Sequence, residues 1–203
     1  YTNRSSISLG IVVTIAELDK AKKSVHEMLE QFKAHPAVQP LIKGGKLVEY
    51  SGHMVAEGGY DMIPELYGNG VLAVGDAAHL VINVGYTVRG MDLAVGSAIA
   101  AAQAVIEAHK KQDYSAGSLA VYKKLLDESF VMKDMKHFKK FPHFMENKRI
   151  FNDYPEMADS IFANVFVVDG SAPKSMRSKL MGPMKKVGLM KLASDGFKGI
   201  RAL

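Results

Sequence analysis

The sequence predicts an α/β fold, more closely an α+β arrangement with strands in its first half and a mostly helical C-terminal third. Val71–Val74 is an apolar run without alternation, which is typical of a strand covered on both faces by helices. Ile7–Val13 alternates apolar with smaller or polar residues, as a half-buried strand does. Beyond residue 113, apolar residues recur mainly at helical spacing.

The first seventy residues are predicted to mix strands with one helix. Residues 1–14 form the first predicted strand, and apolar residues at helical spacing from Leu18 to Phe32 predict a helix. That helix ends near His35, because Pro36 disfavours helical backbone in the residue before it. Residues 41–62 alternate strand-like runs with glycine pairs and include a cross-strand candidate at 47–50.

The predicted strand at residues 71–74 ends in Gly75-Asp76. Gly75 lets the backbone turn, and Asp76 then projects a carboxylate from the carboxyl end of the strand, where open α/β sheets bind ligands. The loop 85–92 follows and leads into a helix with seven alanines between Ala94 and Ala108. This order suits a polyhydroxylated, electron-rich cofactor. As an alternative, Asp76 caps a helix N-terminus.

The C-terminal third is predicted to be helical. Leu119, Tyr122, Leu125, Leu126 and Phe130 would be the inward residues of one amphipathic helix. Residues 153–156, with an early proline, are a helix-start signature for a helix through residue 168. Gly182-Pro183 is predicted to divide the tail into two basic helices.

Charge and cysteine content narrow the function. Residues 174–203 carry eight basic residues and one acidic residue, a net charge of +7, whereas the whole chain carries +5. Such a tail suits anionic lipid, an acidic protein or plain solvation. Nucleic acid is disfavoured, because aromatic residues do not interleave with the basic ones and tryptophan is absent. Without cysteine, the chain can hold no Cys-ligated zinc or iron–sulfur cluster.

No other metal site and no membrane span is predicted. His137 and His143 do not share a helix face, and His79 is expected to be structural. The Ala-rich stretch 93–108 is interrupted by polar residues, and we expect a packed helix in a soluble protein. No signal peptide is recognised.

The string VLAVGDAAH at 71–79 resembles the Gly-Asp motif, the second flavin-binding motif of FAD-dependent hydroxylases and reductases. The longer GDAAHLVINVGYTVRGMDLA at 75–94 looks like the FixC branch, related to electron-transfer-flavoprotein:quinone oxidoreductases. The resemblance extends through residues 1–10, 44–51, 131–138 and 195–203, so it covers the chain.

The resemblance implies part of a glutathione-reductase-like FAD-binding domain and part of a substrate-domain sheet. Residues 1–68 would be the C-terminal part of the substrate domain, 69–112 the FAD-domain strand, motif and helix, and 113–203 a helical region with a basic tail. The expected FAD contacts are these: Gly75, Asp76, Val88, Arg89, Gly90 and Met91. Asp76 would accept a hydrogen bond from a ribityl hydroxyl. Arg89 would either add a cation or pair with a carboxylate.

The glycine-rich turn that opens such proteins and holds the FAD pyrophosphate does not occur here. We therefore expect a C-terminal portion of a larger flavoprotein, with an incomplete FAD site, weak FAD binding and no activity of its own. No catalytic side chain is predicted.

The whole protein would pass electrons from an electron-transfer flavoprotein to a quinone or ferredoxin-like acceptor. The partners implied are the electron-transfer flavoprotein subunits and a separate ferredoxin-like subunit that carries the cluster. Its location would be cytoplasmic, with peripheral contact to the inner face of the membrane through the basic tail. Two alternatives are a non-catalytic docking module and a related prenyl reductase.

Overall fold

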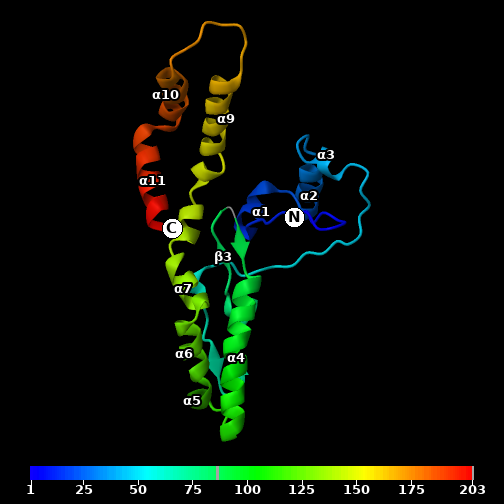
Figure 1. Cartoon of the computed structure of the whole chain (residues 1–203), viewed down its shortest axis with the longest axis vertical. Coiled ribbons are helices and arrows are strands. Elements are labelled where there is room, and N and C mark those ends of the chain that lie inside the picture. Colours follow the sequence, from blue (N-terminus) through cyan, green and yellow to red (C-terminus); the bar gives the residue numbers. More distant parts are fainter. Residues whose placement is uncertain (86, 203) are drawn as a thin grey trace. The chain divides into compact units, whose positions relative to one another are not determined.

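The computed structural model describes residues 1–85 and 87–202, and the chain divides into two compact units, Tyr1–His53 and Met54–Leu203 (Figure 1). The first unit holds α1 (Ile15–Ala21), α2 (Val25–Ala34) and α3 (Gln39–Ile42). The second unit holds the strands β1 (Tyr67–Gly68), β2 (Val71–Leu72), β3 (Ile82–Asn83) and β4 (Val88–Arg89). Its α-helices are α4 (Met91–Lys111), α5 (Ala116–Leu119), α6 (Val121–Glu128), α7 (Phe130–His137), α8 (Phe141–Met145), α9 (Asp153–Phe166), α10 (Met176–Val187) and α11 (Leu189–Ala202). Short 3₁₀ turns lie at Tyr60–Met62 (η1), Gly75–Ala78 (η2) and Lys148–Ile150 (η3).

The helix predicted in the first unit exists but is broken in two. Lys22 adopts a left-handed backbone conformation with φ 50°, which ends α1. Ser24 then starts α2 through a capping box with Glu27, in which each side chain accepts from the other residue's backbone N–H. The predicted end is confirmed, since α2 stops at Ala34 and His35 is extended.

The strands predicted in the first unit are wrong. Residues 1–8 fold back on themselves instead, because the Asn3 N–H donates to the Ser6 carbonyl and the Ser8 N–H to the Tyr1 carbonyl, both at 2.9 Å. A single bridge between Thr2 and Ile7 remains, and residues 47–50 are not a strand. An alternating pattern needs a partner strand as well, and the described part of this unit offers none.

Two small antiparallel hairpins make up the strand structure in the described part of the second unit. β2 pairs with β1, with Tyr67 opposite Leu72, and β4 pairs with β3, with Ile82 opposite Arg89. The strand predicted at 71–74 is therefore present but short, and the predicted burial of both its faces is wrong. Val71 is 59% exposed and β2 has one neighbour among the described strands, so it is an edge strand in this chain.

Helix α4 organises the core of the second unit. It begins after Gly90 and ends at Gln112, whose left-handed backbone (φ 53°) closes the C-terminus. The helix packs against α6, α7 and η2. Five of its small residues are buried: Ser97, Ala100, Ala101, Ala104 and Ala108. The Ala-rich stretch thus forms the tightly packed helix face predicted from the sequence.

The segment predicted as one amphipathic helix after residue 118 is three helices, α5 to α7. Ser129 separates α6 from α7: its backbone is extended and its hydroxyl accepts from the Val131 N–H at 3.2 Å. Leu119, Tyr122 and Leu126 are buried as predicted. Phe130 is 48% exposed, because the new helix start places its ring at the rim of the core.

The last helices confirm the helical C-terminal third but not the predicted break at Gly182-Pro183. Helix α10 runs through Pro183 and ends at Gly188, which has φ 106°. A proline leaves the carbonyl four residues earlier without its helical donor. Here that carbonyl, Lys179 O, accepts a hydrogen bond from Asn164 Nδ2 of α9 at 3.3 Å. Helix α9 begins at Asp153 as predicted and stops at Phe166, two residues short of Val168.

A buried carboxylate joins α11 to the segment before and at the start of α9. Asp195 is 3% exposed and accepts hydrogen bonds from Arg149 Nε at 2.7 Å, Asn147 Nδ2 at 2.8 Å and the Tyr154 hydroxyl. The Arg149 guanidinium is the largest of the contacts that hold the Asp195 pKa well below its usual range. The one acidic residue of the basic tail is therefore sequestered in an ion pair.

We predict that this pair stabilises the fold above about pH 4 and stops doing so as the pH falls further, because the folded-state pKa of Asp195 lies below the unfolded value of about 3.9. Asp195→Asn should lower the thermal unfolding midpoint at pH 7, and the gap to wild type should narrow below about pH 4. Asp169→Asn, in an exposed loop, should change the midpoint little. A gap that is the same at pH 7 and pH 3 would contradict this account.

A second prediction concerns the close crossing of α4 and α7. A Cβ on Gly96 would lie 2.7 Å from Cγ2 of the fully buried Val131, so Gly96→Ala should destabilise the protein by about 1–3 kcal/mol. Gly196→Ala in α11 meets nothing within 4 Å and should gain up to about 1 kcal/mol from helix propensity. Denaturant unfolding of both variants measures the contrast; a Gly96→Ala protein as stable as wild type would contradict the crossing.

Candidate functional site

The candidate site lies where two turns of the second unit meet. The first is η2, which follows β2 and holds Gly75 and Asp76. Gly75 has φ 59°, and a Cβ there would lie 3.1 Å from Cβ of Ala94 on α4. A glycine is therefore required both for the backbone conformation and for the approach of the turn to the helix.

Asp76 is exposed and lies beside the start of α4. The structure places it inside η2, whose N-cap position is taken by Val74, so the alternative of an N-capping Asp76 is wrong. Its Oδ1 is 4.0 Å from the point that a Cβ on Gly90 would occupy. The Gly-Asp turn and the 88–91 loop are thus neighbours, which is the arrangement predicted from the sequence.

Two buried hydroxyl groups hold the Gly-Asp turn from behind. The Gly75 N–H donates to Ser97 Oγ at 3.1 Å, and that hydroxyl donates to the Ala94 carbonyl at 2.9 Å. The Tyr122 hydroxyl donates to the Ala73 carbonyl at 2.8 Å, and burial raises the pKa of Tyr122 to about 12. Sequence reasoning did not assign these two residues to the site. The one sequence signal for such a role was that Ser97 is a serine within an alanine-rich helix.

The second turn, at residues 88–91, provides backbone N–H groups that can donate hydrogen bonds. The β3–β4 hairpin ends at Arg89, and Gly90 then forms the N-cap of α4 without a side chain to accept from the helix's first N–H groups. Those N–H groups and the helix dipole favour negative charge at this end. Val88 and Met91 have exposed side chains, 46% and 87%. This loop can therefore contact a ligand mainly through its backbone N–H groups.

The Arg89 side chain is engaged in ion pairs. Its Nη2 lies 2.5 Å from Asp92 Oδ2 and 2.8 Å from Asp134 Oδ2 on α7. The hydrogen bond to Asp92, followed by that to Asp134, raises the pKa of Arg89 above its ordinary value. Of the two roles considered for this side chain, the structure shows the pairing with carboxylates, which ties the 88–91 loop to α7.

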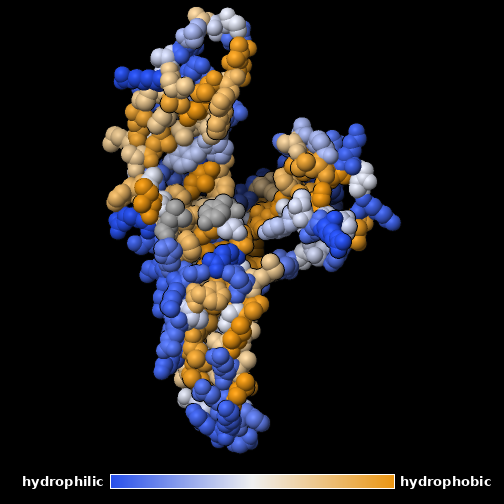
Figure 2. Space-filling view, in the orientation of Figure 1, coloured by the Kyte–Doolittle hydropathy of each residue, from blue (hydrophilic) through white to orange (hydrophobic). Residues whose placement is uncertain are grey.

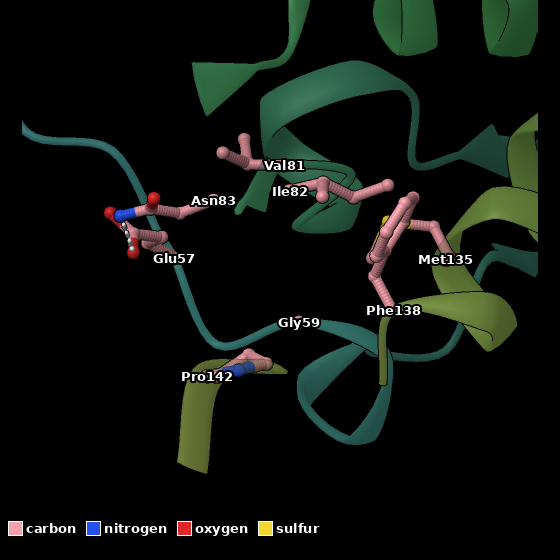
Figure 3. A pocket seen from close by; sticks show the side chains of 8 residues that line it. All are labelled: Glu57, Gly59, Val81, Ile82, Asn83, Met135, Phe138 and Pro142. Carbon is pink, nitrogen blue, oxygen red and sulfur yellow. Dashed lines mark hydrogen bonds between the residues drawn. The ribbon is translucent and has the colours of Figure 1, made fainter. Parts of the chain in front are cut away.

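A small pocket adjoins the β3–β4 hairpin (Figure 3). Two of its lining residues, Glu57 and Asn83, point toward each other, and Asn83 Nδ2 donates to Glu57 Oε1 at 2.8 Å. Asn83 Oδ1 also accepts from the Gly85 N–H at 2.8 Å, which fixes the loop. The pocket has a volume of about 10 Å³, room for roughly one water molecule. It is too small for a flavin ring.

The histidines considered as metal ligands occupy separate places. His79 Nδ1 lies 2.8 Å from the Met62 carbonyl, and its left-handed backbone (φ 56°) closes η2, so it is structural. His137 packs its ring edge-on to Phe138, and His143 lies near Glu146 on the exposed surface. Among residues 1–85 and 87–202, no group of three or more His, Asp or Glu side chains is arranged to hold a metal ion.

Comparisons with known proteins show what the chain is similar to. Residues 141–203 match the model of the ETF-QO/FixC family C-terminal domain, where ETF-QO denotes electron transfer flavoprotein-quinone oxidoreductase. Helix α11 and all of the described hydrogen-bond partners of Asp195 fall inside this match.

Individual relatives extend the match to the whole chain. All 203 residues align at 54% identity with the probable electron transfer flavoprotein-quinone oxidoreductase YdiS of Escherichia coli, and at 53% with Protein FixC of Salmonella typhi. Protein FixC of Azotobacter vinelandii is 37% identical over 209 aligned positions. The chain spans about half the length of these curated relatives, 47% to 48%. The predicted resemblance to FixC-type proteins is confirmed.

We predict that the Ser97 hydroxyl is needed to keep the Gly-Asp turn in place. Ser97→Ala leaves the buried Gly75 N–H without its acceptor, which should cost about 1–3 kcal/mol in the free energy of unfolding. Ser118→Ala is the matched control, because the Ser118 hydroxyl is buried and makes no hydrogen bond within the described structure. Chemical denaturation of both should show a loss for the first variant alone; equal stabilities would contradict the role of Ser97.

Proposed function

We propose that the full-length protein is an FAD-dependent oxidoreductase that passes electrons from an electron-transfer flavoprotein towards a quinone or ferredoxin-like acceptor. The similarity to YdiS and FixC supports this proposal, and it favours a FixC-type protein over a prenyl reductase. The observation that carries it is the proximity of Asp76 to the Gly90 end of α4, because these two turns come from separate motifs of the resemblance.

The residues of the site fit a flavin. Asp76 offers an exposed carboxylate that would accept a hydrogen bond from a ribityl hydroxyl. The backbone N–H groups at the start of α4 would donate to the pyrimidine end of the ring, where negative charge collects on reduction. Gly90, lacking a Cβ, leaves that approach open. Bound FAD would supply the redox chemistry, and no side chain of this chain is needed to move a proton.

Only part of such a site lies in this chain. The described turns supply contacts for the flavin and ribityl portions, and the adjoining pocket holds no more than about a water molecule. The pyrophosphate would be held by a glycine-rich turn of a glutathione-reductase-like domain outside this chain. We therefore propose that residues 1–203 alone bind FAD weakly and have no activity. On this view residues 1–68 complete a substrate domain, 69–112 an FAD domain, and 113–203 a helical domain.

We predict that Asp76→Ala lowers the FAD affinity of the full-length protein roughly tenfold or more, since a hydrogen bond to a charged group contributes about 1.5–3 kcal/mol. Asp159→Ala is the control, because it also removes one exposed carboxylate, on α9, away from the site. Flavin titration of the deflavinated variants measures both affinities. Unchanged affinity in Asp76→Ala would remove Asp76 from the cofactor site.

A docking role for the basic tail is the second proposal. Its one acidic residue, Asp195, is buried against Arg149, so the exposed surface of residues 174–202 carries basic charge without an acid of its own. Acidic residues from α9 approach one side of it, since Asp153 and Glu156 border the same small pocket as Lys186. The remaining basic surface supports contact with anionic lipid at the cytoplasmic face of the membrane or with an acidic ferredoxin-like subunit that carries the cluster.

We predict that the tail binds such a partner in a salt-dependent way. At about 1 kcal/mol for each basic residue near an anionic surface, a few aligned lysines would give attachment that high salt reverses. Reversing charge at Lys185 and Lys198 (to Glu) should weaken sedimentation with anionic vesicles, or capture of the ferredoxin-like subunit, at low salt. Reversal at Lys110 and Lys124, outside the tail, is the control. Absence of both signals at low salt would leave the tail a solvated surface.

A further inference from the structure

Helix α7 and the turn after it carry a group of exposed lysines that the candidate site does not use. They lie within eight residues of the chain, and we call them the α7 basic surface: Lys133, Lys136, Lys139 and Lys140. Three other residues of the same helix are buried in the core: Val131, Met132 and Met135. Figure 2 shows blue, hydrophilic side chains along the edge of the arm that contains α6 and α7.

Most of these lysines have no acidic partner. Among residues 1–85 and 87–202, Lys133, Lys139 and Lys140 take part in no ion pair. Lys139 Nζ lies 5.9 Å from the centre of the Tyr60 ring, and a cation–π contact of this kind leaves its charge in place. The surface is therefore positive and able to attract a negatively charged partner.

The acidic residues next to this surface are already engaged by other cations. Asp127 lies 2.5 Å from Lys123 Nζ and 3.5 Å from Lys136 Nζ, so one carboxylate is shared between two lysines. Asp134 lies 2.8 Å from Arg89 Nη2. Neither carboxylate is free to neutralise the remaining lysines.

The α7 basic surface adjoins the candidate site. Asp134, the residue after Lys133, binds Arg89 in the 88–91 loop, and these two side chains are 33% and 31% exposed. Helix α7 also packs closely on α4, where Val131 lies next to Gly96. A protein bound to the lysines would thus lie beside the elements that begin at the Gly90 turn.

We propose that the α7 basic surface binds the acidic face of a protein that exchanges electrons with the flavin. This inference rests on the proposed function, because that function supplies the need for an electron carrier. A carrier must dock near the flavin, and such encounters bury little area and are guided by complementary charge. Exposed lysines beside the site meet both requirements.

The surroundings of the lysines favour a protein partner over lipid or nucleic acid. Binding to a lipid surface uses apolar side chains that insert, as well as basic ones. The aromatic residues at this surface, Tyr60 and Phe138, are half-buried and packed against the core. The Tyr60 ring also lies 5.9 Å from both Lys136 and Lys139, so it is not free to stack on a base.

Charge reversal in the full-length protein tests the proposal. The variant combines Lys133→Glu with Lys140→Glu, because neither lysine has an ion pair to lose. The matched control combines Lys110→Glu with Lys111→Glu, the same change of charge at the far end of α4, about 30 Å along the helix from its start. The probes are purified electron-transfer flavoprotein and, separately, the ferredoxin-like subunit. Titration calorimetry measures each affinity at low and at high salt, and circular dichroism checks that the variants fold.

A second measurement uses the unsubstituted protein. A carbodiimide joins a lysine amine to a carboxylate only where the two groups are in contact, and mass spectrometry of the digested complex identifies the lysines that were joined. We expect cross-links from the carrier to Lys133, Lys139 or Lys140. Cross-links confined to residues 174–203 would overturn the proposal, because the basic tail would then be the docking surface.

We expect the α7 variant to bind one of the two carriers at least about fivefold more weakly than wild type at low salt, with a smaller difference at high salt. The control should bind within about twofold of wild type. If neither carrier binds wild type at low salt, or both bind the α7 variant as tightly as wild type, the proposal is wrong. Flavin absorbance of the same samples separates the two ideas: carrier binding through the lysines by a protein without flavin refutes the proposed function alone.

Discussion

The close approach of α4 to the Gly-Asp turn is the constraint on which the second unit depends. The Gly75 N–H reaches Ser97 Oγ only because Gly75 lacks a Cβ and Ala94 presents a small one. The same small-residue face admits Val131 of α7 next to Gly96. One alanine-rich helix therefore fixes both the core and the position of the Asp76 turn. Larger residues on this face would separate α4 from the Gly-Asp turn and leave the buried Gly75 N–H without its acceptor.

Charged side chains near the candidate site serve mainly to hold structure. Arg89 is engaged by Asp92 and Asp134. Away from the site, the one acid of the tail, Asp195, is likewise held by Arg149. The groups that remain free to contact a ligand are the backbone N–H groups at the start of α4 and the carboxylate of Asp76. Such a site suits a cofactor that brings its own chemistry and needs positioning and electrostatic support. It also explains why no nucleophile or general base emerges from the sequence.

Helix ends and turns that depend on a few consecutive residues were predicted correctly from the sequence. Features that depend on contacts between residues far apart in the chain were not. The start of α9 at Asp153, the end of α2 at Ala34 and the contact between the Gly-Asp turn and Gly90 all follow from short motifs. The alternating pattern at 7–13 fails because a strand requires a partner that the described unit lacks. Pro183 was predicted to end a helix, but Asn164 on α9 supplies the missing donor, and no neighbouring residue signals this. Ser97 escaped notice because its role depends on a turn 22 residues earlier.

The central claim is that the Gly-Asp turn and the start of α4 together form one side of a flavin site. The most direct measurement is the visible absorption spectrum of the purified full-length protein, recorded as isolated and after incubation with FAD and removal of the excess. The account predicts the absorption bands of oxidised flavin, close to one flavin per protein chain, and their bleaching on reduction. A protein that stays colourless through both steps, while folded, would contradict it.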